Sequence, residues 1–333
     1  MQLNKIFTSH MVFPRRKPIR IYGEGNGRAT ITFAGQKRIV ETDSEKWQIE
    51  FPPMEYGGPY ELQIEYEDRT EFMNDICIGE VFLFAGQSNM QFKMEESNTD
   101  LKLYTSNNKL RMFVADRIEK TDYYTPENGW VVCEKDKVKY WSAIAYLAGN
   151  KITKDNDIAV GVIGCYQGAS VIESWVPEGT FRKLGINIPI SEKNPTHTQP
   201  EYSIWNGDGK LYSYAFSQVV PYSLSAVIWY QGESDSSDSE GKVYFDELKE
   251  LIRIWRKDLK NKELPFIIIQ LANRTDGNKG WKFVQEAQRK IQDQIPSVTT
   301  VISGDVCEVD EIHPPTKHKL AWRVADALKC RMV

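Results

Sequence analysis

Four short, largely apolar runs constrain the fold of this chain most strongly. They occupy residues 81–85, 158–163, 226–230 and 266–272. A strand with one face in water alternates apolar and polar residues, whereas an unbroken apolar run is typical of a strand buried on both faces of a parallel sheet. Three stretches with apolar residues at helical spacing accompany these runs, at 244–259, 282–295 and 317–328. Alternating strands and helices predict an α/β domain with a parallel sheet.

The first 76 residues follow a different pattern. Short apolar or alternating runs at 19–22, 29–33, 47–51 and 60–66 are separated by glycine- and proline-containing turns. Several short strands with such turns are typical of a small antiparallel β-sandwich. We therefore expect an N-terminal sandwich domain at 1–76 and an α/β domain at 77–333, which suits a chain of 333 residues. The poorly patterned stretches 95–143 and 180–203 are interpreted as long excursions beside the functional site.

Composition excludes several classes of protein. With 41% hydrophobic residues, 26% charged residues and a net charge of −4, we expect a globular protein that binds neither nucleic acid nor an anionic membrane. The first residues lack the apolar core of a signal peptide, and no apolar run is long enough to span a membrane. Five widely spaced cysteines without a C-x-x-C pair make a disulfide framework or structural zinc site unexpected. These features favour a cytoplasmic protein with reduced thiols. The oligomeric state stays open.

The first candidate reactive residue is Ser88, in the motif GQSNM at 86–90. It follows the apolar run 81–85, and functional groups of open α/β sheets gather at the carboxyl ends of strands. Gly86 would allow a sharp turn there, so that the serine hydroxyl projects from the sheet edge. A helix N-cap is the alternative role for a serine at such a position.

The candidate base is His313, in the motif DEIHPP at 310–315. It is one of four histidines in the chain. Asp310 lies three residues before it, so one turn of chain could bring a carboxylate to the imidazole and hold it in the tautomer that a base requires. The alternative is a helix N-terminus that favours acidic residues. His197, in the irregular stretch 180–203, stays open as a second candidate base.

Two further segments end buried runs and could stabilise an oxyanion. Gln231 follows the run 226–230, in the motif WYQGES at 229–234, and its amide could donate a hydrogen bond. Gly168 follows the run 158–163, where a glycine N–H can approach a substrate closely. An ordinary loop glutamine and a turn glycine are the alternatives. The chain has no G-x-S-x-G, H-E-x-x-H, P-loop or G-x-G-x-x-G motif. Its few scattered histidines also argue against a histidine-based metal centre.

Together these motifs resemble the SGNH (GDSL-like) hydrolase superfamily, and within it the sialate O-acetylesterase family. GQSNM resembles the block that carries the nucleophile, and Gly168 with IESW at 172–175 resembles the second block. WYQGES is close to the third, and HPP at 313–315 completes the set. The N-terminal FTSHMVF at 7–13 resembles the sandwich that precedes the catalytic domain in this family. The resemblance runs over almost the whole chain.

The resemblance implies a three-layer α/β/α, flavodoxin-like catalytic domain and a serine esterase mechanism. Ser88 would be the nucleophile, His313 the base and Asp310 the acid, with Glu311 as the alternative because relatives often place an acid two residues before the histidine. The N–H groups of Ser88 and Gly168 and the Gln231 amide would form the oxyanion hole. The remaining implied substrate contacts are Gln87, Asn89, Glu233 and Trp175. No metal or organic cofactor is expected.

The implied substrate is an acetyl ester on a sugar, with sialic acid first. Acetylated xylan or mannan, or another short-chain acyl ester, is the alternative substrate, and a non-enzymatic glycan-binding protein is the alternative class. The segment LYSY at 211–214 departs from the LYNG that is common in relatives, which puts the pocket beside it in doubt.

Overall fold

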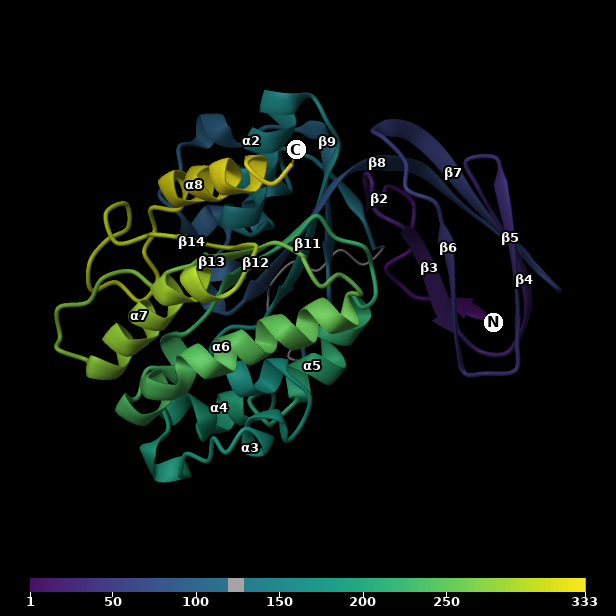
Figure 1. Cartoon of the computed structure of the whole chain (residues 1–333). Coiled ribbons are helices and arrows are strands. Elements are labelled where there is room, and N and C mark those ends of the chain that lie inside the picture. Colours follow the sequence, from purple (N-terminus) through teal and green to yellow (C-terminus); the bar gives the residue numbers. More distant parts are fainter. Residues whose placement is uncertain (119–128, 333) are drawn as a thin grey trace.

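A seven-stranded sheet forms the centre of the molecule, as the computed structural model shows for residues 1–118 and 129–332 (Figure 1). Its order is β10-β9-β11-β8-β12-β13-β14, and all neighbours from β9 to β14 are parallel, while β10 is antiparallel to β9. The strands are β10 (Val131–Cys133), β9 (Asn107–Val114), β11 (Val160–Tyr166), β8 (Thr70–Gly86), β12 (Ala226–Tyr230), β13 (Phe266–Ile269) and β14 (Val298–Val301).

The four apolar runs form the middle of this sheet, which confirms the mixed α/β prediction. Every residue of β11, β12 and β13 is buried, as is the second half of β8. Strand β9 was missed because it lies in the poorly patterned stretch 95–143 and its first three residues are not buried. It also carries Arg111, whose buried guanidinium donates to the backbone oxygens of Asp75 and His10.

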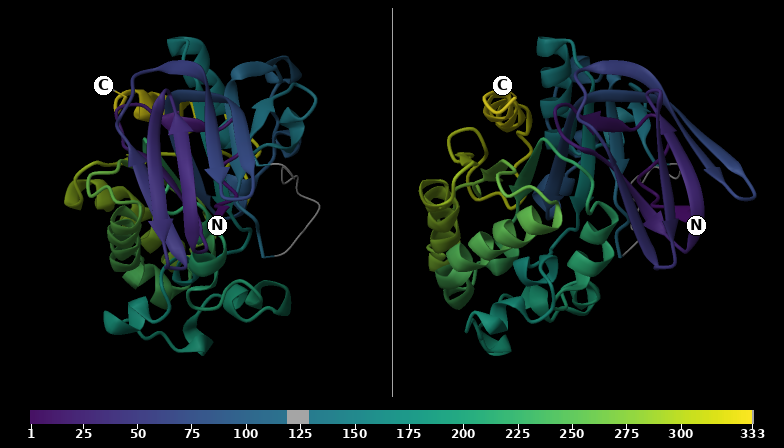
Figure 2. Two further views of the ribbon diagram at one scale, coloured as in Figure 1. Left: turned by 90° about the vertical axis from the view of Figure 1, so that its right-hand side faces the viewer. Right: turned by 45° about the vertical axis from the view of Figure 1, so that its right-hand side comes forward.

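Helices cover both faces of the sheet. Helices α2 (Ala143–Asn156) and α8 (His318–Lys329) pack together on one side, and α6 (Asp238–Asp258) and α7 (Lys279–Gln294) on the other (Figures 1 and 2). The predicted stretches correspond to α6, α7 and α8. Helix α6 begins earlier than its apolar pattern, because the Ser237 side chain accepts a hydrogen bond from the Glu240 N–H and caps it. Helix α2 is buried around most of its surface, so it lacks the one-sided pattern that identifies a helix.

The N-terminal part is built from short strands in two sheets, and all their pairings are antiparallel except that of β2, which pairs in parallel with β8. One has the order β1-β3-β6, and in the other β4 pairs with β5 and β7. Phe33 of β4 and Phe51 of β6 bring their ring centroids to 5.9 Å across the two sheets. The strands are β1 (Gln2–Leu3), β2 (Val12–Pro14), β3 (Ile19–Glu24), β4 (Gly27–Phe33), β5 (Gln36–Thr42), β6 (Lys46–Phe51) and β7 (Gly57–Tyr66).

Strand β8 joins the two parts of the molecule. Its first half pairs antiparallel with β7, and its second half pairs parallel with β11 and β12 (Figure 1). The domain boundary that we predicted between residues 76 and 77 therefore falls inside one continuous strand.

The remaining elements are short. The longer connections contain α1 (Ser88–Gln91), η1 (Met94–Glu96), η2 (Leu101–Leu103), η3 (Val138–Tyr140), η4 (Ile172–Trp175), α3 (Thr180–Lys183), η5 (Ile190–Glu192), η6 (Pro195–His197), α4 (Pro200–Ser203), α5 (Lys210–Tyr214), η7 (Phe216–Gln218) and η8 (Glu233–Asp235). Within the part of the chain that the structure describes, no helix combines the length and the apolar character needed to cross a membrane.

The carboxyl ends of β8, β11 and β12 meet at one edge of the sheet. Gly86 lies opposite Tyr166 on one side and Tyr230 on the other. Its φ of +133° is a conformation that side chains rarely adopt, and a Cβ at this position would lie 2.1 Å from the Tyr230 carbonyl oxygen. Only glycine therefore allows the chain to turn here and present the next residues at the sheet edge.

We predict that Gly86→Ala lowers the free energy of unfolding by about 3 kcal/mol or more, through backbone strain and overpacking. Gly277→Ala is the matched control, because Gly277 has a φ of +78° and nothing within 4 Å of an added Cβ. That change should cost only about 1–2 kcal/mol. Urea unfolding of both variants measures the difference. Equal losses would contradict the close approach at Gly86.

Candidate active site

Ser88 and His313 lie in direct contact at the carboxyl edge of the sheet. The Ser88 Oγ and His313 Nε2 atoms are 2.8 Å apart, although 225 positions separate the residues in the chain. Ser88 is the first residue of α1, immediately after the turn at Gly86 and Gln87. His313 lies in the loop between β14 and α8. A serine hydroxyl within hydrogen-bond distance of an imidazole is the arrangement that a serine nucleophile and its base require.

Asn89 connects the segments that carry these two residues. Its side chain is buried, and its Nδ2 donates to the Glu233 Oε1 at 2.5 Å and to the Ile312 carbonyl at 2.8 Å. Its Oδ1 accepts a hydrogen bond from the Lys317 Nζ at 2.6 Å. Asn89 and Glu233 were predicted as substrate contacts, and the structure places both in this network. Glu233 also lines the cavity over Ser88.

Lys317 was missed by the sequence analysis, which placed it only at the start of the predicted helical stretch 317–328. Its ammonium group instead lies over the rings of Phe92 and Tyr230, fully buried. Burial lowers the pKa of Lys317 to about 8, against the opposing effect of neighbouring acids such as Glu233. Burial likewise raises the pKa of Glu233. No sequence signal marks such a lysine, because its partners come from distant segments.

Gly168, a predicted oxyanion donor, lies beside the serine. A Cβ added to it would be 3.9 Å from the Ser88 Cβ. Its N–H donates to the Gln91 Oε1 at 2.8 Å. An oxyanion could use this donor only by replacing the Gln91 side chain. The Ser88 N–H lies in the first turn of α1, where N–H groups have no partner within the helix.

Gln231, the third predicted oxyanion donor, directly follows β12 but directs its amide to other partners. It is fully buried, and its Nε2 donates both to the Ser170 carbonyl at 3.0 Å and to the Asp235 carboxylate. Its Oε1 accepts from the Tyr244 hydroxyl at 2.8 Å. Both amide hydrogens are therefore committed to neighbours, and none points to an oxyanion in this structure. The residue instead holds β12 to the segment after β11.

Trp175 also differs from its prediction as a substrate contact. Its ring is fully buried and packs edge-on against Trp229 and Trp255. Its Nε1 donates to the Ser170 Oγ at 3.0 Å. This tryptophan belongs to the core between the sheet and α6, because the short helix η4 turns it inward. Gln87 does line the cavity over Ser88, and its Oε1 accepts from the Gly232 and Ser234 N–H groups.

Neither predicted acid contacts the base. The Asp310 carboxylate accepts hydrogen bonds from the Thr275 N–H at 2.6 Å and the Thr275 hydroxyl at 2.5 Å, which hold its pKa below the usual value. Asp310 has a φ of +64°. Its side chain therefore faces the loop after β13, and not the imidazole. Glu311 is exposed. Within residues 1–118 and 129–332, His313 has a hydrogen bond to Ser88 and to neither carboxylate.

The charges that act on His313 come from two other residues. Burial lowers the pKa of its imidazole below the usual value, and the positive charge of Lys317 lowers it further. The Glu96 carboxylate opposes both effects. A histidine with a lowered pKa is neutral at pH 7, as a general base must be.

A cavity of about 500 Å³ opens over the serine and the histidine. Tyr202 and Trp205 line it, with ring centroids 5.8 Å apart, and offer flat apolar faces. Gln167 lines it as well, and its buried Oε1 has no hydrogen-bond partner. These three residues were not predicted, because they belong to no motif and two of them lie in or next to the irregular stretch 180–203.

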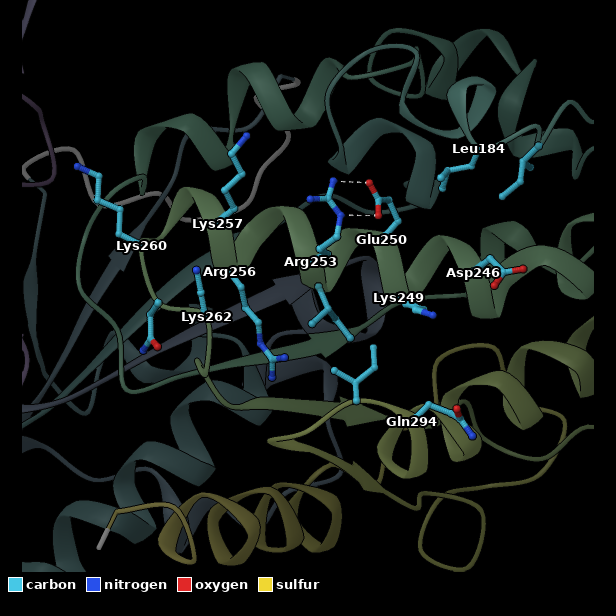
Figure 3. Close-up of a pocket in the computed structure, with 14 residues that line it drawn as sticks. Leu184, Asp246, Lys249, Glu250, Arg253, Arg256, Lys257, Lys260, Lys262 and Gln294 are labelled. Carbon is cyan, nitrogen blue, oxygen red and sulfur yellow. Dashed lines mark hydrogen bonds and ion pairs between the residues drawn. The ribbon is translucent and has the colours of Figure 1, made fainter.

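Two other cavities lack this chemistry. A larger one, about 960 Å³, runs along α6 and is lined by basic side chains such as Lys249, Arg253 and Lys257 (Figure 3). It shares no lining residue with the cavity over Ser88. His197, the second candidate base, lines a third cavity beside Glu240 and makes no contact with Ser88. The structure therefore does not place His197 as the partner of the nucleophile.

Comparisons with known proteins point to one family. The model of the family described as "Carbohydrate esterase, sialic acid-specific acetylesterase" matches residues 78–329. The human sialate O-acetylesterase is 24% identical over 352 residues, covering 91% of this chain and 65% of that protein. The mouse sialate O-acetylesterase is 22% identical, covering 91% of this chain and 68% of its own length. The chain thus spans about two thirds of these relatives.

A solved structure shows the same fold. The crystal structure of a carbohydrate acetylesterase from Xanthomonas citri superposes with a TM-score of 0.85 at 23% identity, covering 98% of this chain and 74% of that one. Because only 23% of the aligned residues are identical, this similarity shows a shared fold and nothing about function. Since the family model matches from Ile78 at the middle of β8 to Lys329 at the end of α8, the chain belongs to the carbohydrate esterase, sialic acid-specific acetylesterase family.

Proposed function

We propose that this protein hydrolyses O-acetyl esters of carbohydrates, with Ser88 as nucleophile and His313 as base. The observation that carries the proposal is the 2.8 Å contact between the Ser88 Oγ and the His313 Nε2 at the floor of a cavity, in a chain of this family. A glycan-binding protein would have no use for a serine held against a neutral imidazole.

The reaction proceeds through an acyl-serine. His313 takes the proton from the Ser88 hydroxyl as the Ser88 oxygen attacks the ester carbonyl and forms a tetrahedral intermediate. Its collapse breaks the bond between the carbonyl carbon and the sugar oxygen and leaves the acetyl group on the serine. His313 then returns the proton to the sugar oxygen that leaves, and water repeats the cycle on the acyl-serine. The N–H groups of Ser88 and Gly168 are the proposed oxyanion donors, and the substrate displaces Gln91 from the second. Gln231 no longer belongs to this set.

The proposed substrate is an O-acetylated sugar, with acetylated sialic acid first. The relatives named as sialate O-acetylesterases support this choice. The rings of Tyr202 and Trp205 suit the apolar faces of a sugar, and the free Gln167 Oε1 suits a hydroxyl donor. Acetate release from acetylated sialic acids, compared with acetylated xylan and mannan oligosaccharides, tests the choice. Sugar binding without acetate release from any of them would support the glycan-binding alternative.

We predict that Ser88→Ala lowers kcat for acetate release by about 10⁴–10⁶-fold, because no nucleophile remains. His313→Ala should have a loss of similar size, since the proton has no acceptor. Ser217→Ala is the control: Ser217 is exposed and bonds only to the Ser213 carbonyl. Initial rates on an acetylated sugar measure all three. Full activity of Ser88→Ala would refute the mechanism.

We propose that Asp310 positions the His313 loop through Thr275. Asp310→Asn and Thr275→Val should then each lower kcat by about 10–100-fold, the size expected for a base that is slightly misplaced, and Glu311→Gln should retain wild-type activity. A loss of about 10⁴-fold in Asp310→Asn with Thr275→Val unchanged would show instead that Asp310 contacts the imidazole directly during the reaction.

The pH profile tests the electrostatics of the base. Activity should rise with pH as the His313 imidazole loses its proton, below the usual histidine pKa. Lys317→Met removes a positive charge that lowers this pKa, so the acid limb of kcat/KM should move to higher pH. Glu96→Gln removes the opposing negative charge, so the limb should move to lower pH.

Lys319→Met is the control for this pair, because Lys319 is exposed on the same helix. Circular dichroism checks that each variant is folded. Shifts of the same sign in folded Lys317→Met and Glu96→Gln would contradict the assignment of His313 as the titrating base.

A further inference from the structure

A second cluster of chemically active side chains lies outside the proposed active site. It comprises His197 at the end of η6, Asp235 at the end of η8 and Glu240 in the first turn of α6. One ligand atom from each residue lies within 4.8 Å of the other two. The three residues line a cavity of about 290 Å³ that shares no lining residue with the cavity over Ser88.

Among the residues that the structure describes, two buried atoms of this cluster have no polar partner other than each other. They are the His197 Nε2 and the Glu240 Oε1, and each side chain is only 4% exposed. The two atoms lie 2.5 Å apart and form an ion pair if the imidazole is protonated, whereas a neutral imidazole would direct a lone pair at the carboxylate. Buried polar atoms nearly always have a partner, because leaving one unsatisfied costs free energy. A cation bound where the lone pairs of the two atoms converge would satisfy both atoms.

The cavity also carries an excess of negative charge. Its lining contains the carboxylates of Glu173, Asp235, Glu240 and Glu247. Glu173 is paired with the Lys193 ammonium at 2.5 Å, so three carboxylates remain around one imidazole. Carboxylates that share one small cavity repel one another. A cation would relieve this repulsion, and the volume leaves room for water to complete its coordination.

We propose that His197, Asp235 and Glu240 bind a divalent transition-metal ion, with zinc as the best match. One imidazole nitrogen and two carboxylates form a three-residue ligand set of the kind that zinc accepts, at about 2.0–2.2 Å from each ligand atom. Tetrahedral bonds of this length place ligand atoms roughly 3.3–3.6 Å apart. The three ligand atoms lie within 4.8 Å of one another, and the His197 Nε2 and Glu240 Oε1 atoms, now 2.5 Å apart, would move apart to bind one ion. Calcium and magnesium take oxygen ligands, so an imidazole does not suit them.

This site departs from our expectation of no metal. No motif in the sequence indicates it, because the ligands come from three separate elements and form no spaced pattern. One of them, His197, also lies in the stretch 180–203, which has no regular pattern.

The ion would fix one wall of the cavity over Ser88. Asn194 and Thr196, which line that cavity, shortly precede the ligand His197 in the chain. The Asn194 N–H donates to the Glu240 Oε2 at 2.8 Å, and the Thr196 hydroxyl donates to the Ser234 carbonyl at 3.3 Å. Asp235 accepts hydrogen bonds from the Ile172 N–H and from Gln231. Loss of the ion should therefore raise KM for the sugar more than it lowers kcat.

The test is metal binding by the full chain. The protein is stripped with EDTA, incubated with Zn²⁺ and desalted, and its zinc content and Tm are measured. We expect one zinc per chain and a higher Tm with Zn²⁺ than with EDTA. His197→Gln and Glu240→Gln should each weaken zinc affinity by at least about 10–100-fold, the loss typical of changing even an outer-shell partner.

His10→Gln is the matched control. His10 also contacts a carboxylate, with its Nδ1 2.8 Å from the Asp75 Oδ2, but that pair is half-exposed and lies far from the cluster in the β-rich part of the molecule. This variant should bind zinc as the wild type does. Zinc uptake that His10→Gln abolishes and His197→Gln does not would overturn the assignment.

Two further results would also overturn the proposal. One is a wild-type protein that takes up no Zn²⁺, Mn²⁺ or Co²⁺ and keeps the same Tm, which would leave His197 and Glu240 sharing a proton. The other is uptake of Ca²⁺ or Mg²⁺ that persists in His197→Gln. If the variants do not fold, the visible spectrum of wild type with Co²⁺ decides, since a four- or five-coordinate protein site has d–d bands far stronger than those of hydrated Co²⁺. Bands no stronger than those of hydrated Co²⁺ would overturn the proposal. None of these measurements depends on esterase activity.

Discussion

The hydrogen bonds of the buried Asn89 side chain hold the proposed active site together. One amide accepts from Lys317 and donates to Glu233 and to the carbonyl of Ile312. It thereby joins the turn after β8, the segment after β12 and the loop that carries His313. The contact between Ser88 and His313 is made between neighbours of Asn89 in two of these segments, so its geometry depends on this amide.

The network also explains how two ionisable groups are tolerated in the interior. A buried charge is costly unless it is paired or hydrogen-bonded. Lys317 and Glu233 bond to opposite ends of the Asn89 amide. The Lys317 ammonium donates to the Asn89 Oδ1, and the Asn89 Nδ2 donates to the Glu233 carboxylate. The rings of Phe92 and Tyr230 supply further stabilisation to the ammonium group. The lysine can then act on the imidazole by its charge alone.

The sequence predicted those features of the fold and the site that depend on a local pattern of residues. Unbroken apolar runs identified the central strands, and Ser88 and His313 each lay in a recognisable motif at a strand end or in a proline-rich loop. It could not predict where side chains point. Asp310 adopts a left-handed backbone and faces Thr275, and Gln231 and Trp175 turn into the core, although all three lie in or beside motifs. Lys317 and the cluster around His197 were missed because they exist only through contacts between distant segments.

Strand β8 limits where this chain can be cut into two parts. The catalytic α/β part and the N-terminal sheets share it, and the family match begins within it. Further bonds cross the same junction, from the Tyr222 hydroxyl to the Val12 carbonyl and from the Trp130 Nε1 to the Ile6 carbonyl. A gene rearrangement that cut at this point would leave half a strand on each product and remove partners from both. The N-terminal strands and the catalytic sheet therefore depend on each other for the backbone hydrogen bonds along β8.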